Sequence, residues 1–251
     1  MDDAELLAAL GENTAFFRAV GRASPGAQLV ERDGVLACVA SVAPDRSVLN
    51  SVVYGSSAAL LSRYDELRGV YEAAGVRAWT VWVPPVDGEV TEFLGARGHV
   101  LDAAPQMMGM ALDGLPDSRP AGPGDWSREL EPAILGRIND IAYGFEPSFE
   151  KAFVGFPLDA AHWYVARVES EPVACLMTSD EGTDVDVNMV AALPAARGRG
   201  LVTDLLTHAL IDARERGLRS TTLVATQLGR PVYERLGYRP LGEIQMWERR
   251  T

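Results

Sequence analysis

The sequence has few cysteines and histidines, the residues that most often build disulfide frameworks and metal sites. Cys38 and Cys175 are the two cysteines among 251 residues, and each stands inside an apolar run, so we expect buried free thiols rather than a disulfide. The three histidines, His99, His162 and His208, stand far apart, without cysteine or acidic ligand spacing. This pattern predicts no metal site and indicates a reducing, cytoplasmic environment.

Long hydrophobic runs and a surplus of basic residues are also missing. No apolar run reaches the length that spans a membrane, and residues 1–5 lack the positive segment of a secretion signal. A net charge of −12 argues against nucleic acid and against an anionic membrane surface as partners. Hydrophobic residues make up 47% of the chain, which is enough for a folded core, and the acidic balance suits a cationic, amine-bearing partner.

Helical and strand-like segments alternate along the chain, which predicts a mixed α/β fold. In the first half we expect helices at residues 5–20, 57–74 and 89–96, and strands at 28–31, 35–43, 48–54, 78–83 and 106–112. In the second half we expect helices at 133–143, 148–153, 201–216 and 230–236, and strands at 163–169, 173–178, 185–192, 220–226 and 243–249.

The two halves resemble each other in residues as well as in order. Residues 72–77 match residues 214–219 around a helix-ending glycine, and residues 94–99 match residues 233–238 in the same way. This repetition predicts a duplicated domain.

A segment rich in glycine, proline and aspartate separates the two copies. We expect a first domain at 1–112, a linker at 113–124 and a second domain at 125–251.

A basic, glycine-rich loop lies between the strand at 185–192 and the helix at 201–216. It reads Arg197-Gly198-Arg199-Gly200, and it leads directly into the first helical turn. The first amides of a helix have no internal partner and the dipole there favours negative charge, so this order predicts an anion site, although an ordinary turn has the same order. The spacing fits neither the dinucleotide fingerprint nor the nucleoside triphosphate loop.

The first copy lacks this loop. Asn188 precedes Gly217 by 29 residues, whereas the matching Asn50 precedes Gly75 by 25, and the difference falls where the second copy has residues 197–200. We therefore expect one anion site per chain, in the second copy.

The loop resembles the pyrophosphate loop of the GNAT superfamily of N-acetyltransferases, Gln/Arg-x-x-Gly-x-Gly/Ala. Here it reads Arg197-Gly198-Arg199-Gly200-Leu201-Val202, and Val202 departs from the small residue at the last position. Residues 231–238, Pro-Val-Tyr-Glu-Arg-Leu-Gly-Tyr, resemble the second signature of the same family, which places Tyr233 near the thioester sulfur. The resemblance covers residues 133–249 and, in weaker form, residues 1–112.

The resemblance implies two tandem GNAT-like domains, each with a mostly antiparallel twisted sheet flanked by helices, of which the first is degenerate. It implies acetyl-coenzyme A as co-substrate, with the pantetheine arm pairing along the strand at 190–192, which splays from the next strand. The residues it assigns to the coenzyme are Val190, Ala191, Ala192, Arg197, Gly198, Arg199, Gly200, Leu201 and Val202.

Three residues are candidates for the chemistry of acetyl transfer. The family position of the Val190 backbone N–H makes it the donor to the developing oxyanion. Asp184, Asp186 and Asn188 alternate with valines and share one strand face, where Asp186 is the candidate base and an ordinary solvated face is the alternative. A calcium loop is rejected, because the valine alternation marks a strand. Tyr233 is the candidate acid for the thiolate, and a core aromatic residue is the alternative.

These features predict transfer of an acetyl group, by direct attack, to an amine of a small molecule or peptide. The alternative from another class is a non-catalytic acyl-coenzyme A binding or sensing module. A plain dimerisation scaffold is a third interpretation, and the sequence is compatible with a homodimer in any of these cases. Turnover stimulated by an amine separates the first two, and any coenzyme binding excludes the third.

Overall fold

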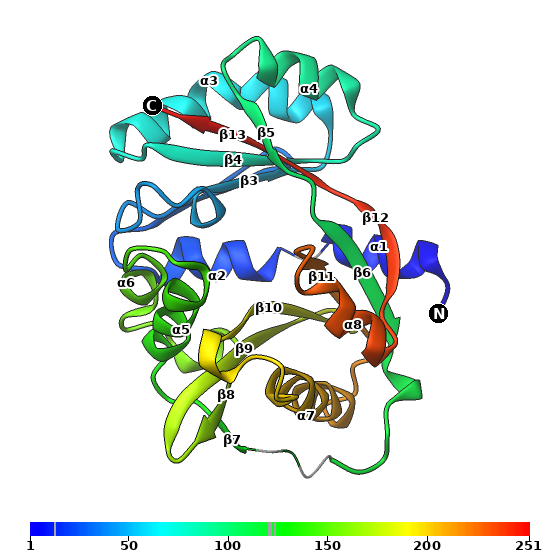
Figure 1. The fold of residues 1–251 in the computed structure, drawn as a ribbon. Helices are drawn as coiled ribbons and strands as arrows, with labels where there is room; N and C mark the ends of the chain where they lie inside the picture. The colour runs from blue at the N-terminus through cyan, green and yellow to red at the C-terminus, as the bar shows by residue number, and fades with distance from the viewer. Residues whose placement is uncertain (13, 120–121, 123) are drawn as a thin grey trace. The chain divides into compact units, whose positions relative to one another are not determined.

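The computed structural model describes residues 1–12, 14–119, 122 and 124–251, which form two compact units (Figure 1). Unit 1 combines Met1–Phe16 with Gln106–Gly242, and unit 2 combines Phe17–Pro105 with Glu243–Thr251. Each unit has one mixed sheet in which antiparallel pairs outnumber parallel ones. The predicted mixed α/β class with two sheets is confirmed.

Unit 2 contains a six-stranded sheet and its covering helices. The strand order is β1 (Gln28–Arg32), β2 (Val35–Val39), β3 (Ser51–Tyr54), β4 (Ala78–Val83), β13 (Gln245–Arg250) and β5 (Val100–Ala103). The helices are most of α2 (Ala15–Ala23), η1 (Ser47–Leu49), α3 (Ser57–Ala73) and α4 (Gly88–Gly95). Helix α3 buries Leu60, Tyr64, Leu67 and Tyr71, a spacing of three and four residues that makes one apolar stripe against the sheet.

Unit 1 contains a seven-stranded sheet. The strand order is β12 (Arg239–Glu243), β6 (Gln106–Ala111), β11 (Ser220–Ala225), β10 (Asp184–Ala192), β9 (Glu171–Glu181), β8 (His162–Val168) and β7 (Asp125–Arg128). The helical segments are α1 (Asp3–Glu12), η2 (Leu112–Gly114), α5 (Ala133–Tyr143), α6 (Phe149–Phe153), η3 (Leu158–Ala160), η4 (Pro194–Ala196), α7 (Leu201–Glu215) and α8 (Arg230–Leu236).

The core of unit 1 lies between α7 and one face of its sheet. Val185 and Val187 of β10 point into this core with Leu205 and Leu210 of α7. Helix α5 packs on the opposite face of the sheet. The residues on either side of Cys175 in β9, Ala174 and Leu176, belong to the core with α7, so the Cys175 side chain points to the other face, where it contacts Asn139 of α5. Strand β10 therefore runs between two covering helices.

Each unit receives a strand from a distant part of the chain. Strand β6 pairs with β11 in unit 1, although it precedes the linker, and the last strand, β13, pairs with β4 in unit 2. The compact units therefore do not coincide with the contiguous boundaries 1–112 and 125–251. Alternation predicts that a segment is a strand with one apolar face, but it does not name the sheet to which that strand adds. The duplication itself stays a prediction.

Some element bounds also differ from the expectation. The helix expected at 5–20 is two helices, α1 and α2, and the strand expected at 48–54 is the turn η1 followed by β3. The short strands β5, β7 and β12 were not expected, because they carry little apolar alternation. Of the expected linker at 113–124, residues 120, 121 and 123 lie outside the described residues.

Candidate functional site

Strands β10 and β11 separate midway along their length. In the described chain they pair in parallel only where residues 184–186 of β10 lie beside residues 220–222 of β11. Strand β10 then continues to Ala192 and β11 to Ala225 without pairing each other. The facing edges of these two segments present backbone donors and acceptors that an extended, amide-containing ligand can pair with. The splay has the form expected from the sequence.

A bulge interrupts β10 beside this splay. The register with β9 shifts between Asn188 and Ala191, and Met189 has a φ of 55°, a left-handed conformation that is rare for a non-glycine residue. Two side chains of α5 bind the carbonyls at the bulge. Asn139 Nδ2 lies 3.0 Å from Met189 O, and Tyr143 Oη lies 3.4 Å from Val190 O. Sequence reasoning missed Asn139, because a polar residue in a helix carries no signal of its distant partner.

The loop at residues 193–200 ends in an open helix N-terminus. Gly198 and Gly200 have φ values of 73° and 82°, which favour glycine, and no described atom lies within 4 Å of the position that a Cβ would take at either residue. Helix α7 begins at Leu201, and no described side chain caps it. The amides of Leu201, Val202 and Thr203 have no acceptor inside the helix, so this end can bind an anion.

The two arginines of the loop have different surroundings. The Arg197 guanidinium donates to Ala142 O at 2.6 Å and to Ala192 O at 3.3 Å, so it braces the end of α5 against the end of β10. Arg199 is exposed at the loop surface. The role of both arginines as phosphate ligands stays a prediction, and the geometry favours Arg199 together with the helix amides. The side chain of Val202, the residue that departs from the family pattern, is partly buried and packs against the core of unit 1.

Asp186 lies on the polar face of β10, as expected. Its neighbour Asp184 is buried and accepts hydrogen bonds from Ser220 Oγ and Thr222 Oγ1, both at 2.6 Å, so this end of the face is not solvated. Asp186 is half-buried and accepts a hydrogen bond from Asn188 Nδ2. Burial raises the pKa of Asp186 to about 7; the bond from Asn188 opposes this shift, and the charge of Asp184 adds to it. A carboxyl with this pKa exchanges protons at neutral pH.

Tyr233 is a core aromatic residue whose hydroxyl stays protonated. It is 7% exposed, and its ring packs edge-on against Tyr238 with centroids 5.7 Å apart. Burial raises the pKa of Tyr233 well above its usual range, and the nearby Tyr143 adds to the shift. The core interpretation of Tyr233 is therefore compatible with a role as proton donor.

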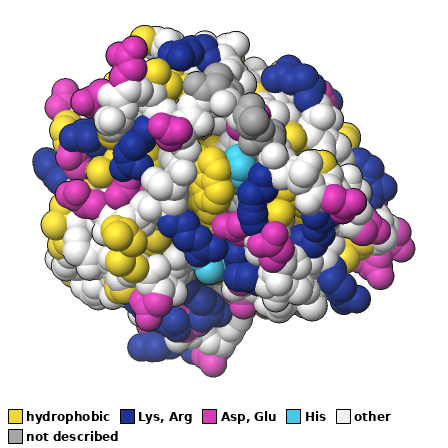
Figure 2. All heavy atoms as spheres, turned by 90° about the horizontal axis from the view of Figure 1, so that it is seen from below, with side chains coloured by type: hydrophobic (Ala, Val, Ile, Leu, Met, Phe, Trp, Pro, Cys, Tyr) yellow, Lys and Arg dark blue, Asp and Glu magenta, His cyan; other side chains and the backbone are white. Residues whose placement is uncertain are grey.

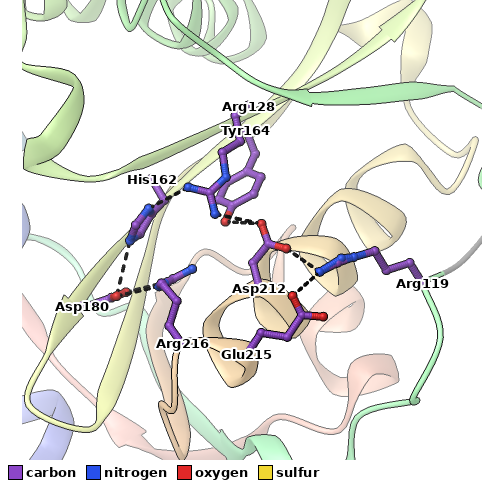
Figure 3. A network of polar contacts seen from close by, with 8 residues as sticks. All are labelled: Arg119, Arg128, His162, Tyr164, Asp180, Asp212, Glu215 and Arg216. Carbon is purple, nitrogen blue, oxygen red and sulfur yellow. Dashed lines mark hydrogen bonds and ion pairs between the residues drawn. The ribbon is translucent and has the colours of Figure 1, made fainter.

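The opposite end of α7 carries a network of charged side chains (Figure 3). Asp212 accepts from Arg119 at 2.7 Å, from Arg128 at 3.1 Å and from Tyr164 Oη at 3.0 Å. Arg119 also contacts Glu215 at 2.7 Å. The carboxylates neutralise these arginines, so this end of α7 is not a second anion site.

The same network continues onto β8 and β9 (Figure 3). His162 lies 3.3 Å from Asp180 and 3.1 Å from Arg128, and Arg216 binds Asp180 through two nitrogens at 2.7 and 2.8 Å. Burial opposes ionisation of Asp180, but the bonds from His162 and Arg216 outweigh it and hold the pKa of Asp180 well below its usual range. Figure 2 shows basic and acidic side chains intermixed on one face of the molecule, so no field of one sign covers that face.

Clusters of metal ligands and membrane-spanning helices are both absent from the described residues. Among them, no group of three or more histidine, cysteine, aspartate or glutamate side chains is arranged to hold a metal ion. No helix in the described part of the chain combines the length and the apolar character needed to cross a membrane. Cys38 and Cys175 are both free and buried, as expected.

Comparison with known proteins identifies the domain in unit 1. Residues 159–240, which include β8 to β11, the glycine loop, α7 and α8, match the family described as acetyltransferase (GNAT) domain. The chain therefore carries a GNAT acetyltransferase domain, whose general reaction is acetyl-coenzyme A-dependent N-acetyl transfer. No curated protein matches the chain.

Solved structures share the fold over nearly the whole chain. A GCN5-related N-acetyltransferase from Kribbella flavida is 17% identical with a TM-score of 0.65, covering 96% of this chain and 95% of that one. A tandem GNAT protein from the clavulanic acid biosynthesis pathway is 15% identical with a TM-score of 0.60, covering 98% and 91%. A GCN5-related N-acetyltransferase from Sphaerobacter thermophilus is 14% identical with a TM-score of 0.57, covering 86% and 80%. These likenesses show that the chain shares its fold with GNAT proteins, one of which is a tandem GNAT protein.

Proposed function

We propose that the protein transfers an acetyl group from acetyl-coenzyme A to the amine of a small molecule or peptide. The observation that carries the proposal is the joint geometry of β10 and α7. A strand that is bulged and splayed from its neighbour runs into a glycine loop and then into an uncapped helix N-terminus. This arrangement suits a ligand with a diphosphate at one end and an extended amide chain at the other.

We assign coenzyme binding to the glycine loop with the start of α7 and to the unpaired edge of β10. The amides of residues 201–203, with Arg199 beside them, hold the diphosphate, and glycines at 198 and 200 leave room for it. The edge of β10 at residues 190–192 pairs with the amides of the pantetheine arm. This assignment brings the thioester towards the bulge.

We assign proton transfer and charge stabilisation to three groups: the Val190 N–H, Asp186 and Tyr233. The Val190 N–H donates to the oxyanion that develops when the amine attacks the thioester carbonyl. Asp186 takes a proton from the acceptor, directly or through water, because an alkylammonium with a pKa of about 10.4 must lose a proton before it attacks. Tyr233 gives a proton to the departing thiolate, and its raised pKa keeps that proton available.

The test is an assay of thiol release with acetyl-coenzyme A and a panel of alkylamines and peptides with free amino groups. We expect thiol release that depends on at least one amine, and an acetylated amine of matching mass. Coenzyme binding without turnover on any amine would instead favour a sensing module. Absence of coenzyme binding would exclude both functions.

A further inference from the structure

The bulge in β10 contains a backbone conformation that its own sequence does not favour. Met189 has a φ of 55°, and β10 has no glycine at this point. Left-handed backbone brings the Cβ of an L-residue close to the following carbonyl oxygen, so it persists only where surrounding contacts hold it. A hydrogen bond to the backbone of Met189 is one contact that can hold this conformation.

Asn139 of α5 supplies the shorter of two such contacts, because the Cys175 thiol, a weak donor, lies 3.4 Å from the same Met189 carbonyl oxygen. Asn139 is 3% exposed, and its Nδ2 lies 2.9 Å from Leu135 O, 3.0 Å from Met189 O and 3.3 Å from Cys175 Sγ. The two nearest oxygens are carbonyls, which only accept hydrogen bonds, so the side-chain amide has to turn its nitrogen towards them. Its two N–H groups match these two acceptors, one on its own helix and one at the bulge.

The Asn139 bond also sets the direction of the next amide. A trans peptide is planar, and its C=O and N–H groups point in opposite directions. The Met189 carbonyl points to α5, where it meets Asn139, so the Val190 N–H in the same peptide plane points away from α5. Val190 is the residue that the proposed function makes the oxyanion donor.

We propose that Asn139 is a positioning residue for acyl transfer: through the Met189 carbonyl it holds the strained bulge that aims the Val190 amide. This inference rests on the proposed function for its catalytic part. Its structural part, the coupling between Asn139 and the conformation of Met189, stands without any activity.

A double-mutant cycle between Asn139 and Met189 tests the coupling. Asn139→Ser keeps a hydrogen bond to Leu135 O, four residues earlier on the helix, but cannot reach Met189 O. Met189→Gly removes the steric cost, because glycine takes positive φ readily. Asn139→Ser should lower kcat by about tenfold in the Met189 background and by less than about threefold in the Met189→Gly background. The tenfold figure is the rate equivalent of the free-energy cost of left-handed backbone in a non-glycine residue. The KM for acetyl-coenzyme A should change little.

The second readout is the amide resonance of Val190 in a two-dimensional NMR spectrum. Asn139→Ser should shift it in the Met189 background and leave it nearly in place in the Met189→Gly background. This measurement needs no substrate, so it decides the coupling even if no amine is acetylated and the proposed function fails. Thermal unfolding of all four proteins reports whether each is folded, and a cycle of unfolding free energies gives the same coupling.

Asp140, the next residue of α5, is the matched control. It accepts from the backbone amides of Ser148, Phe149 and Glu150, and in the described part of the chain these bonds tie it to the start of α6 rather than to the bulge. Asp140→Asn should cost the same in both Met189 backgrounds. If Asn139→Ser behaves in this way too, with equal effects on kcat and on the Val190 resonance in both backgrounds, Asn139 is an ordinary packing residue and the proposal is overturned.

Discussion

Helices α3 and α7 each follow a strand that makes a parallel pair in its sheet, yet their N-termini are built in different ways. In unit 2 only Gly55 and Ser56 separate β3 from α3, and Ser56 Oγ accepts from Ala59 N at 3.3 Å, which caps the helix. In unit 1 residues 193–200 separate β10 from α7, and no described side chain caps that helix. A capped end satisfies its own amides, whereas an open end leaves them for a ligand.

The preceding strands differ in the same direction. Strand β3 pairs in parallel with β4 over only two residues, and β10 pairs in parallel with β11 over only three. The register of β10 with β9 shifts at a bulge, whereas the register of β3 with β2 runs without a shift from Val52 to Tyr54. A short parallel pairing is thus common to both units, and the bulge and the open loop distinguish unit 1. The comparison supports one coenzyme site per chain.

The largest expected effect comes from closing the open loop with a charge. Gly200→Asp places a β-carbon at a φ of 82° and a carboxylate beside the anion site, so coenzyme binding should fall by more than about a hundredfold. Calorimetry should give one acetyl-coenzyme A per chain for the unaltered protein and none for the variant. Gly75→Asp in unit 2, at a φ of 70°, is the control for backbone strain. A stoichiometry of two would show that unit 2 also binds the coenzyme and would contradict the difference inferred between the units.

Removal of the Tyr233 hydroxyl should have the next largest effect. Tyr233→Phe keeps the buried ring, so stability and coenzyme affinity should barely change while turnover falls about a hundredfold, at the lower end of general acid catalysis. Tyr238→Phe is the matched control, because Tyr238 bonds Thr221 at 2.9 Å inside the core. It should lower the melting temperature rather than turnover. Full turnover in Tyr233→Phe would return Tyr233 to a packing role.

Substitutions of the two loop arginines should affect different properties, coenzyme affinity for Arg199 and stability for Arg197. Charge-assisted contacts contribute about 1.5–3 kcal/mol, so Arg199→Ala should weaken coenzyme binding by about ten- to a hundredfold. Arg197→Ala should instead lower the melting temperature, because Arg197 braces α5 against β10. Calorimetry and thermal unfolding of both variants give the two comparisons. Equal losses of affinity would show that Arg197 also reaches the phosphates.

Asp186 predicts a pH dependence of both rate and stability. With a pKa of about 7, the fraction of Asp186 in the basic form increases as pH passes through neutrality, so the rate should rise there. Asp186→Asn should lose rate at neutral pH. Its rate should recover towards about pH 10.4, where the amine loses its proton without a base. The folded pKa lies above the unfolded value, so folding favours the protonated form and Asp186 lowers stability as pH rises from about 4 to 7. Asp186→Asn should therefore raise the melting temperature at pH 8. A uniform loss of rate at every pH would make Asp186 a substrate-binding residue.

The smallest effect is expected at the capped helix of unit 2. Ser56→Ala removes the acceptor for Ala59 N and should lower the free energy of unfolding by about 1 kcal/mol. Chemical denaturation followed by circular dichroism measures it. Coenzyme affinity should not change, because unit 2 lacks the long loop. A change in affinity would indicate that this helix end also contributes to coenzyme binding.

Local patterns in the sequence predicted most of the elements and much of the candidate site. Glycines at 198 and 200 predicted a tight turn into a helix, and both have a positive φ, which favours glycine. Strict alternation placed Asp184, Asp186 and Asn188 on one face, because side chains alternate along any strand. Prediction was weaker at β5, β7 and β12, where few apolar residues mark a buried face.

The sequence by itself determined the features that depend on neighbours within one turn or one strand: the order of elements, the open loop before α7, the missing loop in the first copy and the resemblance to GNAT proteins. Only the tertiary structure decided the features that depend on partners far apart along the chain. Strands β6 and β13 joined sheets built mostly from other segments, Arg197 turned to the backbone of α5, and Asn139 reached Met189 fifty residues away. Hydrogen bonds between distant segments form only once packing brings those segments together, so no local pattern records them.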